Sequence, residues 1–236
     1  MNIYYYILIS PINQYIKNIS AFKVESPLKL CYNRVMKITE IKMAKSGAKV
    51  IIDGGKEFVF SPEIVYRYGI KKDMDLNEKI FFEYKEESDK LLAKQYLFNY
   101  LGGRQKSILQ AKRKLKEKGY GSNAVNYAIE KALDYKLLDD NQFAQAYIDN
   151  YKKNKGLKMI KYQLLGLGVD EEVIDAYLTE NEEIEMQTAL RLGRKYVESK
   201  KEKASKDKLY RYLYGKGFDG STIIKVINEV FSDIQE

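Results

Sequence analysis

Three runs of basic side chains, with tyrosines among them, are the residues of this sequence best suited to binding an anionic partner. Arg104–Lys118 holds seven Lys or Arg and one acid, Lys152–Lys161 holds five Lys and no acid, and Arg191–Lys216 holds ten basic residues and three acids. Lys and Arg neutralise phosphates without reading bases, so these runs predict salt-sensitive, sequence-independent contacts with nucleic acid. A protein–DNA filament is also polyanionic, and the same basic runs could bind it.

The individual contact candidates come from these runs. The basic candidates are Arg104, Lys112, Arg113, Lys152, Lys153, Lys158, Lys161, Lys208 and Arg211. Tyr151 and Tyr210 are candidate stacking or interface residues. The plainer alternative is that a charged run is only a solvated helix face and that a tyrosine at helical spacing borders a core. Recurrence of the runs in three places favours the binding interpretation.

Composition excludes several kinds of chemistry. Among 236 residues there are 41 Lys+Arg against 33 Asp+Glu, a net charge of +8, one Cys and no His. Without His there is no Ser-His or Cys-His pair, and one Cys cannot form an intramolecular disulfide or a zinc site. The single Cys fits a reducing compartment, so we expect a cytoplasmic protein. No segment approaches the roughly 18 apolar residues of a membrane span.

Two motifs that resemble catalytic sites have simpler explanations. Asp139-Asp140 precedes a helical pattern, and a helix cap explains it. Gly102-Gly103-Arg104 lacks the spacing of a phosphate-binding loop. We therefore predict no catalytic residue, no metal and no cofactor.

The C-terminal two thirds of the chain repeat with a period of 49 residues. The period is anchored on Gly119, Gly168 and Gly217. Apolar or aromatic residues recur in six further columns around these glycines, which makes seven columns in three copies without a gap. The columns include Leu115, Leu164 and Leu213 four residues before the glycine, Val125, Ile174 and Ile223 six residues after it, and Phe98, Tyr147 and Tyr196 further upstream.

Each repeat is predicted to contain three helices around a small core. The glycine supplies the left-handed residue that ends a helix, and Ser122, Asp170 and Asp219 are candidate caps of the next helix. One such unit buries little surface, so neighbouring units should stack. The expected helices are 89–101, 105–118, 122–135, 140–153, 157–166, 171–179, 182–202, 206–215 and 220–231.

The N-terminal part differs from the repeats. Residues 37–88 predict a small module in which strands at 49–52 and 56–60 flank Asp53-Gly54-Gly55 as a hairpin. Lys37–Met43 could add a third strand, Ser61-Pro62 begins a helix, and Asp75 could cap a second short helix through about Glu83. Two interpretations of residues 1–36, which include Cys31, stay open: a flexible extension, or translation that begins at Met36.

The central repeat carries a motif that resembles a known family. Leu137–Tyr147 is similar to the LLDDxxFAxxY signature of RecX regulatory proteins. Lys155-Gly156, Ile160, Leu164 and Gly168-Val169 continue the family pattern, and so does Lys208–Leu213 with Gly217-Phe218. Gln163 departs from it, since the family often has Glu there. The resemblance covers about residues 37–236.

The resemblance implies a non-enzymatic modulator of the RecA recombinase. Such proteins bind along the RecA–single-stranded DNA filament and curb its ATP hydrolysis, strand exchange and co-protease activity. They thereby regulate homologous recombination, DNA repair and the SOS response. The partners implied are the RecA filament and single-stranded DNA, bound directly or through the filament, with no membrane and a monomeric regulator.

The fold class predicted is mainly α, with three tandem three-helix repeats behind a small β-hairpin-containing module. The segments are the extension 1–36, the module 37–88, and repeats at 89–138, 139–180 and 181–236. Two other functions stay open. One is a helical-repeat protein that binds DNA without a recombinase, and the other is a scaffold for an acidic protein that needs no nucleic acid.

Overall fold

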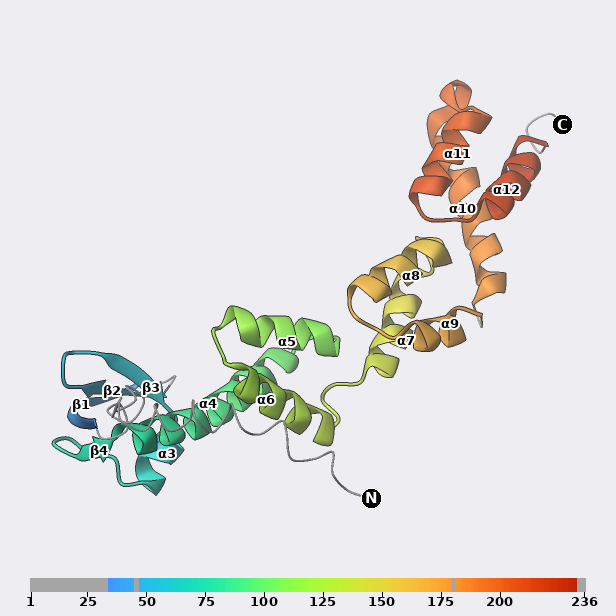
Figure 1. Cartoon of the computed structure of the whole chain (residues 1–236). Helices are drawn as coiled ribbons and strands as arrows, with labels where there is room; N and C mark the ends of the chain where they lie inside the picture. The colour runs from blue at the N-terminus through green and yellow to red at the C-terminus, as the bar shows by residue number, and fades with distance from the viewer. Residues whose placement is uncertain (1–33, 45–46, 180, 233–236) are drawn as a thin grey trace, which may run out of the picture. The chain divides into compact units, whose positions relative to one another are not determined.

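The computed structural model describes residues 34–44, 47–179 and 181–232 (Figure 1). The chain divides into two compact units, one ending at Lys85 and the other beginning at Glu86. Cys31 and the predicted extension up to residue 33 lie outside the described residues. Within the described residues the chain is mainly helical, with a small sheet near its N-terminal end, which confirms the predicted fold class.

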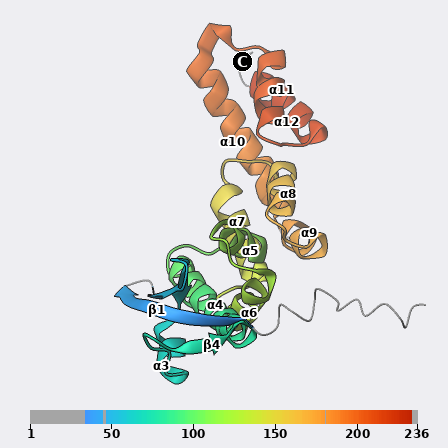
Figure 2. The same cartoon turned by 60° about the vertical axis from the view of Figure 1, so that its left-hand side comes forward.

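The first unit contains a four-stranded antiparallel sheet in the order β3-β2-β1-β4. Its strands are β1 (Val35–Ala44), β2 (Gly47–Ile52), β3 (Glu57–Phe60) and β4 (Asp75–Asn77). Figure 2 shows the long strand β1 beside β4. The turn between β2 and β3 places Gly54 and Gly55 at φ values of +80° and +76°, so the predicted hairpin forms where glycines allow a left-handed backbone.

The sheet buries one side against the helices that follow it in the chain. Helix α3 (Pro62–Arg67) begins after Ser61, with proline in its first turn as predicted. Ile38, Val50 and Phe60 from the sheet are completely buried, as are Ile64 and Phe81 from the helices. The ring of Phe81 meets that of Phe60 edge-on at a centroid distance of 5.3 Å.

The expected short helix from Asp75 to about Glu83 was wrong in its start and its length, because the helix that contains Glu83 begins at Glu78 and continues to Leu101. Asp75–Asn77 instead forms β4, because its backbone pairs with Val35–Lys37. This pairing joins segments distant in sequence, so no local pattern could reveal it. Helix α4 (Glu78–Leu101) then runs unbroken through the expected gap before residue 89, and the side chain of Asn77 accepts a hydrogen bond from the N–H of Lys79 at 2.9 Å. No Gly or Pro interrupts residues 78–101.

The second unit is a series of three three-helix groups. The first group contains the C-terminal part of α4 with α5 (Ile108–Glu117) and α6 (Ser122–Asp134). The second contains α7 (Asp140–Tyr151), α8 (Leu157–Gly166) and α9 (Glu171–Thr179). The third contains α10 (Glu182–Lys200), a 3-10 turn at Lys201–Lys203, α11 (Lys206–Gly215) and α12 (Gly220–Ser232).

The glycine column ends the second helix of every group in the same way. Gly119, Gly168 and Gly217 have φ values of +86°, +81° and +87°, a region that L-residues adopt at a cost. The N–H of the residue after each glycine donates back to the leucine carbonyl five residues earlier, at 3.2 to 3.3 Å. This is the Schellman pattern of a helix C-terminus, and it satisfies a carbonyl that the helix leaves unpaired.

Each group has its own apolar core, and the columns that recur every 49 residues contribute side chains to all three cores. The buried clusters centre on α4–α6, on α7–α9 and on α10–α12. Leu115, Leu164 and Leu213 have no exposed surface in any of the three copies. In each group, the residues of these columns lie on one face of the second helix and one face of the third, and these two faces pack against each other.

Two of the three predicted caps are confirmed. Asp170 accepts from the N–H of Glu172, and Asp219 accepts from the N–H of Ser221, each at 2.9 Å. Ser122 is not a cap, because α6 begins at Ser122 itself and Gly121 precedes it without a side-chain hydrogen bond. Among the described residues, no helix is both long and apolar enough to cross a membrane.

We predict that alanine is tolerated differently at two glycines of the same column. A β-carbon at Gly119 would meet open space, whereas one at Gly217 would lie 2.8 Å from the backbone nitrogen of Met159. Gly119→Ala should therefore lose only the left-handed backbone cost of about 1–2 kcal/mol. Gly217→Ala should lose clearly more in urea unfolding, and equal losses for the two variants would contradict the packing of Gly217 on α8.

Candidate functional site

The first and second helix groups are joined at the beginning of α5. The hydroxyl of Ser107 donates to the carbonyl of Leu167 at 2.7 Å, and a carboxylate oxygen of Asp140 accepts from the N–H of Ile108 at 2.9 Å. The first N–H groups of a helix have no partner within the helix, so the next group supplies one here. We call this set of contacts the first joint.

The second and third groups meet in the same manner at the beginning of α8, which we call the second joint. The N–H of Gly156 donates to the carbonyl of Lys216, and a carboxylate oxygen of Glu185 accepts from the N–H of Leu157, both at 2.9 Å. Gly156, Leu157 and Lys216 lie one 49-residue period after their counterparts in the first joint. The joint is therefore part of the repeat.

In both joints a glycine turn of one group packs against the second helix of the group before it. A β-carbon at Gly168 would come within 2.7 Å of the side chain of Leu109. Gly217 lies against Met159, and Gly156 lies against the backbone of Gly217. This close approach, together with the hydrogen bonds, fixes the spacing between successive groups.

The Asp140 carboxylate carries an electrostatic cost at the first joint. Burial raises the pKa of Asp140 above its ordinary value, and the neighbouring charge of Asp139 raises it further. The hydrogen bond from Ile108 and the charge of Lys112 act in the opposite direction. Burial outweighs both, because a carboxylate loses hydration as the two groups come together.

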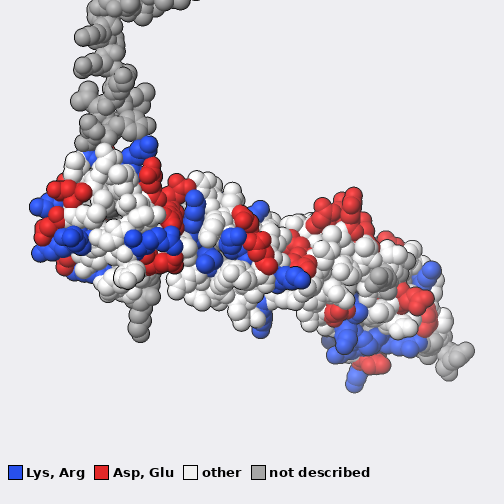
Figure 3. Space-filling view, turned by 90° about the horizontal axis from the view of Figure 1, so that it is seen from below, with Lys and Arg blue, Asp and Glu red and all other residues white. Residues whose placement is uncertain are grey.

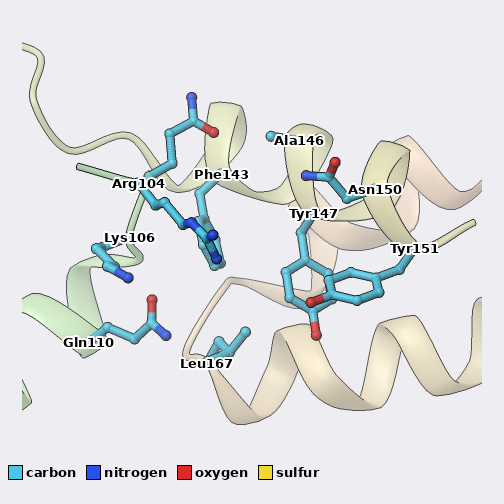
Figure 4. A pocket seen from close by; sticks show the side chains of 10 residues that line it. Arg104, Lys106, Gln110, Phe143, Ala146, Tyr147, Asn150, Tyr151 and Leu167 are labelled. Atoms are coloured by element: carbon cyan, nitrogen blue, oxygen red, sulfur yellow. The ribbon is translucent and has the colours of Figure 1, made fainter. Parts of the chain in front are cut away.

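A cavity of about 670 Å³ opens beside the first joint (Figure 4). Figure 4 shows side chains from the α4–α5 loop and the beginning of α5 on one side and side chains of α7 on the other. Cations, amides, aromatic rings and small apolar groups line it, namely Arg104, Gln105, Lys106, Gln110, Phe143, Ala146, Tyr147, Asn150, Tyr151 and Leu167.

Three aromatic rings spaced four residues apart form the α7 wall of this cavity. The ring centroids of Phe143 and Tyr147 lie 5.9 Å apart, and those of Tyr147 and Tyr151 lie 4.5 Å apart. The Tyr147 hydroxyl donates to the side-chain oxygen of Gln163 at 2.9 Å, which also accepts from the Lys155 ammonium at 2.8 Å. Gln163 thereby holds both Tyr147 and Lys155, whose Nζ lies 4.0 Å from the Tyr151 ring centroid.

The structure brings two of the sequence candidates together at this cavity, Arg104 and Tyr151. Lys112 and Arg113 are exposed on α5, and Lys153 is exposed in the turn after α7. Lys158 is exposed near the beginning of α8. Hydrogen bonds from Ser221 lower the pKa of Asp219, and the charge of Lys158 adds to that effect.

Two other candidates are already paired inside the second group. Lys152 forms an ion pair with Asp149 at 2.6 Å and donates to the side chain of Asn181 at 3.0 Å. Lys161 forms ion pairs with Asp175 at 2.6 Å and Glu171 at 2.8 Å, contacts that raise its pKa. The run itself contains no acid, but Asp149, three residues before Lys152 on α7, pairs with Lys152, and two acids of α9 pair with Lys161.

The candidates of the third group lie together on α11, away from the cavity. Lys208 donates to the carbonyl of Lys203, and Arg211 donates to the carbonyl of Asp207. Tyr210 is stacked with Tyr214 at a centroid distance of 6.1 Å. On the face shown in Figure 3, Lys and Arg are interspersed with Asp and Glu, and a marked gathering of basic side chains lies over the third group.

Sequence reasoning missed most residues of the cavity. Gln110, Phe143 and Asn150 come from two helix groups, and the contact between groups is not visible in the local sequence. One signal was available in the four-residue spacing of Phe143, Tyr147 and Tyr151, which places three rings on one helix face.

The comparisons with known proteins agree with this architecture. A family model described as the second three-helix domain of RecX matches residues 139–178, and one described as the third three-helix domain matches residues 182–227. A Regulatory protein RecX of Clostridium perfringens (strain 13 / Type A) is 31% identical over 192 residues, which cover 78% of this chain and 91% of the relative. A Regulatory protein RecX of Clostridium acetobutylicum is 29% identical over 209 residues, covering 85% and 98%.

Solved structures show the same fold. The crystal structure of a regulatory protein RecX aligns with a TM-score of 0.60 and 22% identity over 82% of this chain and 99% of that one. The structure of RecX from Lactobacillus salivarius aligns with a TM-score of 0.55 and 22% identity over 60% of this chain and 96% of that one. At this identity the likeness concerns the fold.

The three joined three-helix groups define a helical-repeat protein, and its surface beside the first joint carries cations and aromatic rings. With a relative at 31% identity over most of both sequences, the chain belongs to the RecX family of regulatory proteins. The family resemblance of the Leu137–Tyr147 motif is thereby confirmed.

We predict opposite outcomes for two substitutions at Asp140. Asp140→Ala leaves the N–H of Ile108 without its acceptor and should cost about 1 kcal/mol of stability. Asp140→Asn keeps an acceptor and has no charge to desolvate, so it should be as stable as the natural protein or more so at neutral pH. An Asn variant as unstable as the Ala variant would contradict the hydrogen bond.

The pH dependence follows from the direction of the Asp140 pKa. Because its pKa is raised in the folded protein, the folded state holds the proton more tightly than the unfolded state does. The contribution of Asp140 to stability therefore falls as pH rises through the ordinary value of 3.8 and towards the folded value. Urea unfolding as a function of pH should show this fall in the natural protein and its absence in Asp140→Asn.

Proposed function

We propose that this protein binds along the RecA–single-stranded DNA filament and regulates RecA, mainly as an inhibitor. The activities restrained would be DNA-dependent ATP hydrolysis, strand exchange and the co-protease function, through which the protein would regulate DNA repair. Membership of a family of regulatory proteins supports the proposal. The protein would act as a monomer in the cytoplasm, without catalysis of its own.

The observation that carries the proposal is a cation at the same place in two joined groups. Arg104 and Lys153 are one 49-residue period apart, and each lies in the turn before the second helix of its group. Both side chains are exposed, and neither has a hydrogen bond or ion pair among the described residues. The third copy of this position is Glu202, so the pattern covers two of the three groups.

The joints make this spacing useful for binding a filament. Equivalent hydrogen bonds at the first and second joints hold successive groups in a repeated relation. A filament presents the same subunit surface and the same phosphates again and again along its axis. A regulator whose contact residues recur can therefore bind several subunits at once. Several weak contacts made together give strong binding.

We predict that two double substitutions, each of which removes two lysine charges, have different effects on the inhibition of RecA. Lys153→Ala/Lys158→Ala removes two exposed cations, so several-fold more protein should be needed to inhibit RecA ATP hydrolysis on single-stranded DNA. Lys152→Ala/Lys161→Ala removes two cations that are paired inside the second group, so inhibition should change little. The thermal midpoint of this control pair should fall, because its acids lose their partners.

The same assay tests the proposal as a whole when the natural protein is titrated against RecA. Inhibition well below one regulator per RecA subunit supports filament binding. No effect at equimolar amounts, combined with tight binding to bare DNA, would overturn it in favour of a DNA-binding protein that acts without a recombinase. Equal losses for the two lysine pairs would show that only net charge matters.

A further inference from the structure

The cavity beside the first joint has features that filament binding by surface charge does not require. It lies between two helix groups and is open to solvent, and its volume of about 670 Å³ lies in the range of small-molecule sites. The joint itself is made by Ser107, Ile108, Asp140 and Leu167, and of these only Leu167 lines the cavity. The side chains that line the cavity are therefore largely distinct from the residues that form the joint.

One wall is suited to a flat, aromatic ligand. Phe143, Tyr147 and Tyr151 form a continuous row of rings along α7, and Asn150 adds an amide beside them. Lys155 does not line the cavity, but its ammonium lies over the Tyr151 ring and holds it in place. A nucleobase gains affinity by stacking on such rings, and side-chain amides can pair with its edge.

The opposite wall is suited to an anion. The Arg104 side chain has no hydrogen bond or ion pair among the described residues, and Lys106 lies beside it in Figure 4. The side-chain oxygen of Gln110 accepts from the N–H of Ser107 at 3.1 Å, so its NH₂ group remains as a donor. In Figure 4 this nitrogen is turned towards the cavity.

The charge of the lining selects among ligands. Two cations and no carboxylate are found among the ten described residues that line the cavity. By contrast, a second hollow, at the second joint, is lined by Lys158, Lys161 and Lys225 together with Asp175 and Glu185. Of these two hollows among the described residues, the first combines positive charge that no lining carboxylate compensates with a row of aromatic rings.

We propose that this cavity binds one unpaired nucleotide. The base lies against the ring wall of α7, and its phosphate is held by Arg104 and Lys106. A base paired within a duplex is stacked on both faces and cannot enter a pocket without being extruded, so the site takes unpaired nucleotides. The ligand chemistry, a base with a phosphate, is shared by a nucleotide within a single strand and a free nucleoside phosphate.

This binding does not involve the recombinase, so it is tested with the full chain alone. Fluorescence anisotropy compares a labelled oligothymidylate with an abasic strand of the same length and charge. Because stacking one base contributes substantially to affinity, we expect the thymidylate strand to bind about tenfold more tightly. Equal affinities for the two strands would overturn the proposal.

Two variants assign the preference to the cavity. Tyr151→Leu removes a ring and keeps an apolar side chain, and Ala146→Leu fills the cavity without removing a ligand contact. Both should bring the ratio of the two affinities close to one while the circular dichroism of the protein is unchanged. Tyr162→Leu is the matched control, since Tyr162 is exposed on α8 outside the cavity, and its ratio should stay at the natural value.

Two arginine variants separate the phosphate site from general charge. Arg104→Gln should weaken the thymidylate strand more than the abasic strand, because the phosphate then no longer positions the base. Arg113→Gln removes the same charge from the exposed surface of α5 and should weaken both strands equally. A preserved ratio in Tyr151→Leu, Ala146→Leu and Arg104→Gln would overturn the site, even if inhibition of RecA were intact.

Thymidine 5′-monophosphate identifies the source of the nucleotide. Chemical-shift changes confined to cavity residues on adding it would show that a free nucleotide is sufficient. Binding of the thymidylate strand with the tenfold preference, but without a response to the monophosphate, would show that the nucleotide must belong to a strand. Either result supports the cavity as the site.

Discussion

The structure depends on how one three-helix group is held by the next. A single group leaves the first N–H groups of its second helix without partners, and it has too small a core to be robust alone. At both joints the following group supplies the acceptor, Asp140 for Ile108 and Glu185 for Leu157, and lays its glycine turn against the same helix. One interaction thus completes a helix end and sets the spacing of the groups.

This constraint determines where functional side chains can lie. The turn before the second helix is fixed by the joint, and that turn carries Arg104 in the first group and Lys153 in the second. The first joint also brings the α4–α5 loop opposite the aromatic row of α7, which creates the cavity. At the second joint the positions that correspond to Phe143, Tyr147 and Tyr151 are Leu192, Tyr196 and Lys200, so only one of the three rings recurs there.

The repeat was predictable because its determinants are local. A left-handed glycine and the leucine four residues before it act within one helix end, and their spacing of 49 residues is visible in the sequence. The pairing of Asp75–Asn77 with β1 was not predictable, since it depends on a distant strand. The pairing of Lys161 with Asp175 was missed for the same reason: the acid lies on another helix, and only the packing of α8 on α9 brings the two together.

Amide hydrogen exchange at the joints, measured residue by residue by NMR, tests the central claim most directly. If the joints hold the groups together, the amides of Ile108, Gly156 and Leu157 should exchange far more slowly than that of Ser122, which also begins a helix but has no side-chain cap before it. Exchange of all four at the rate of an open chain would mean that the groups move independently, and that neither the repeated cations nor the cavity is held in place.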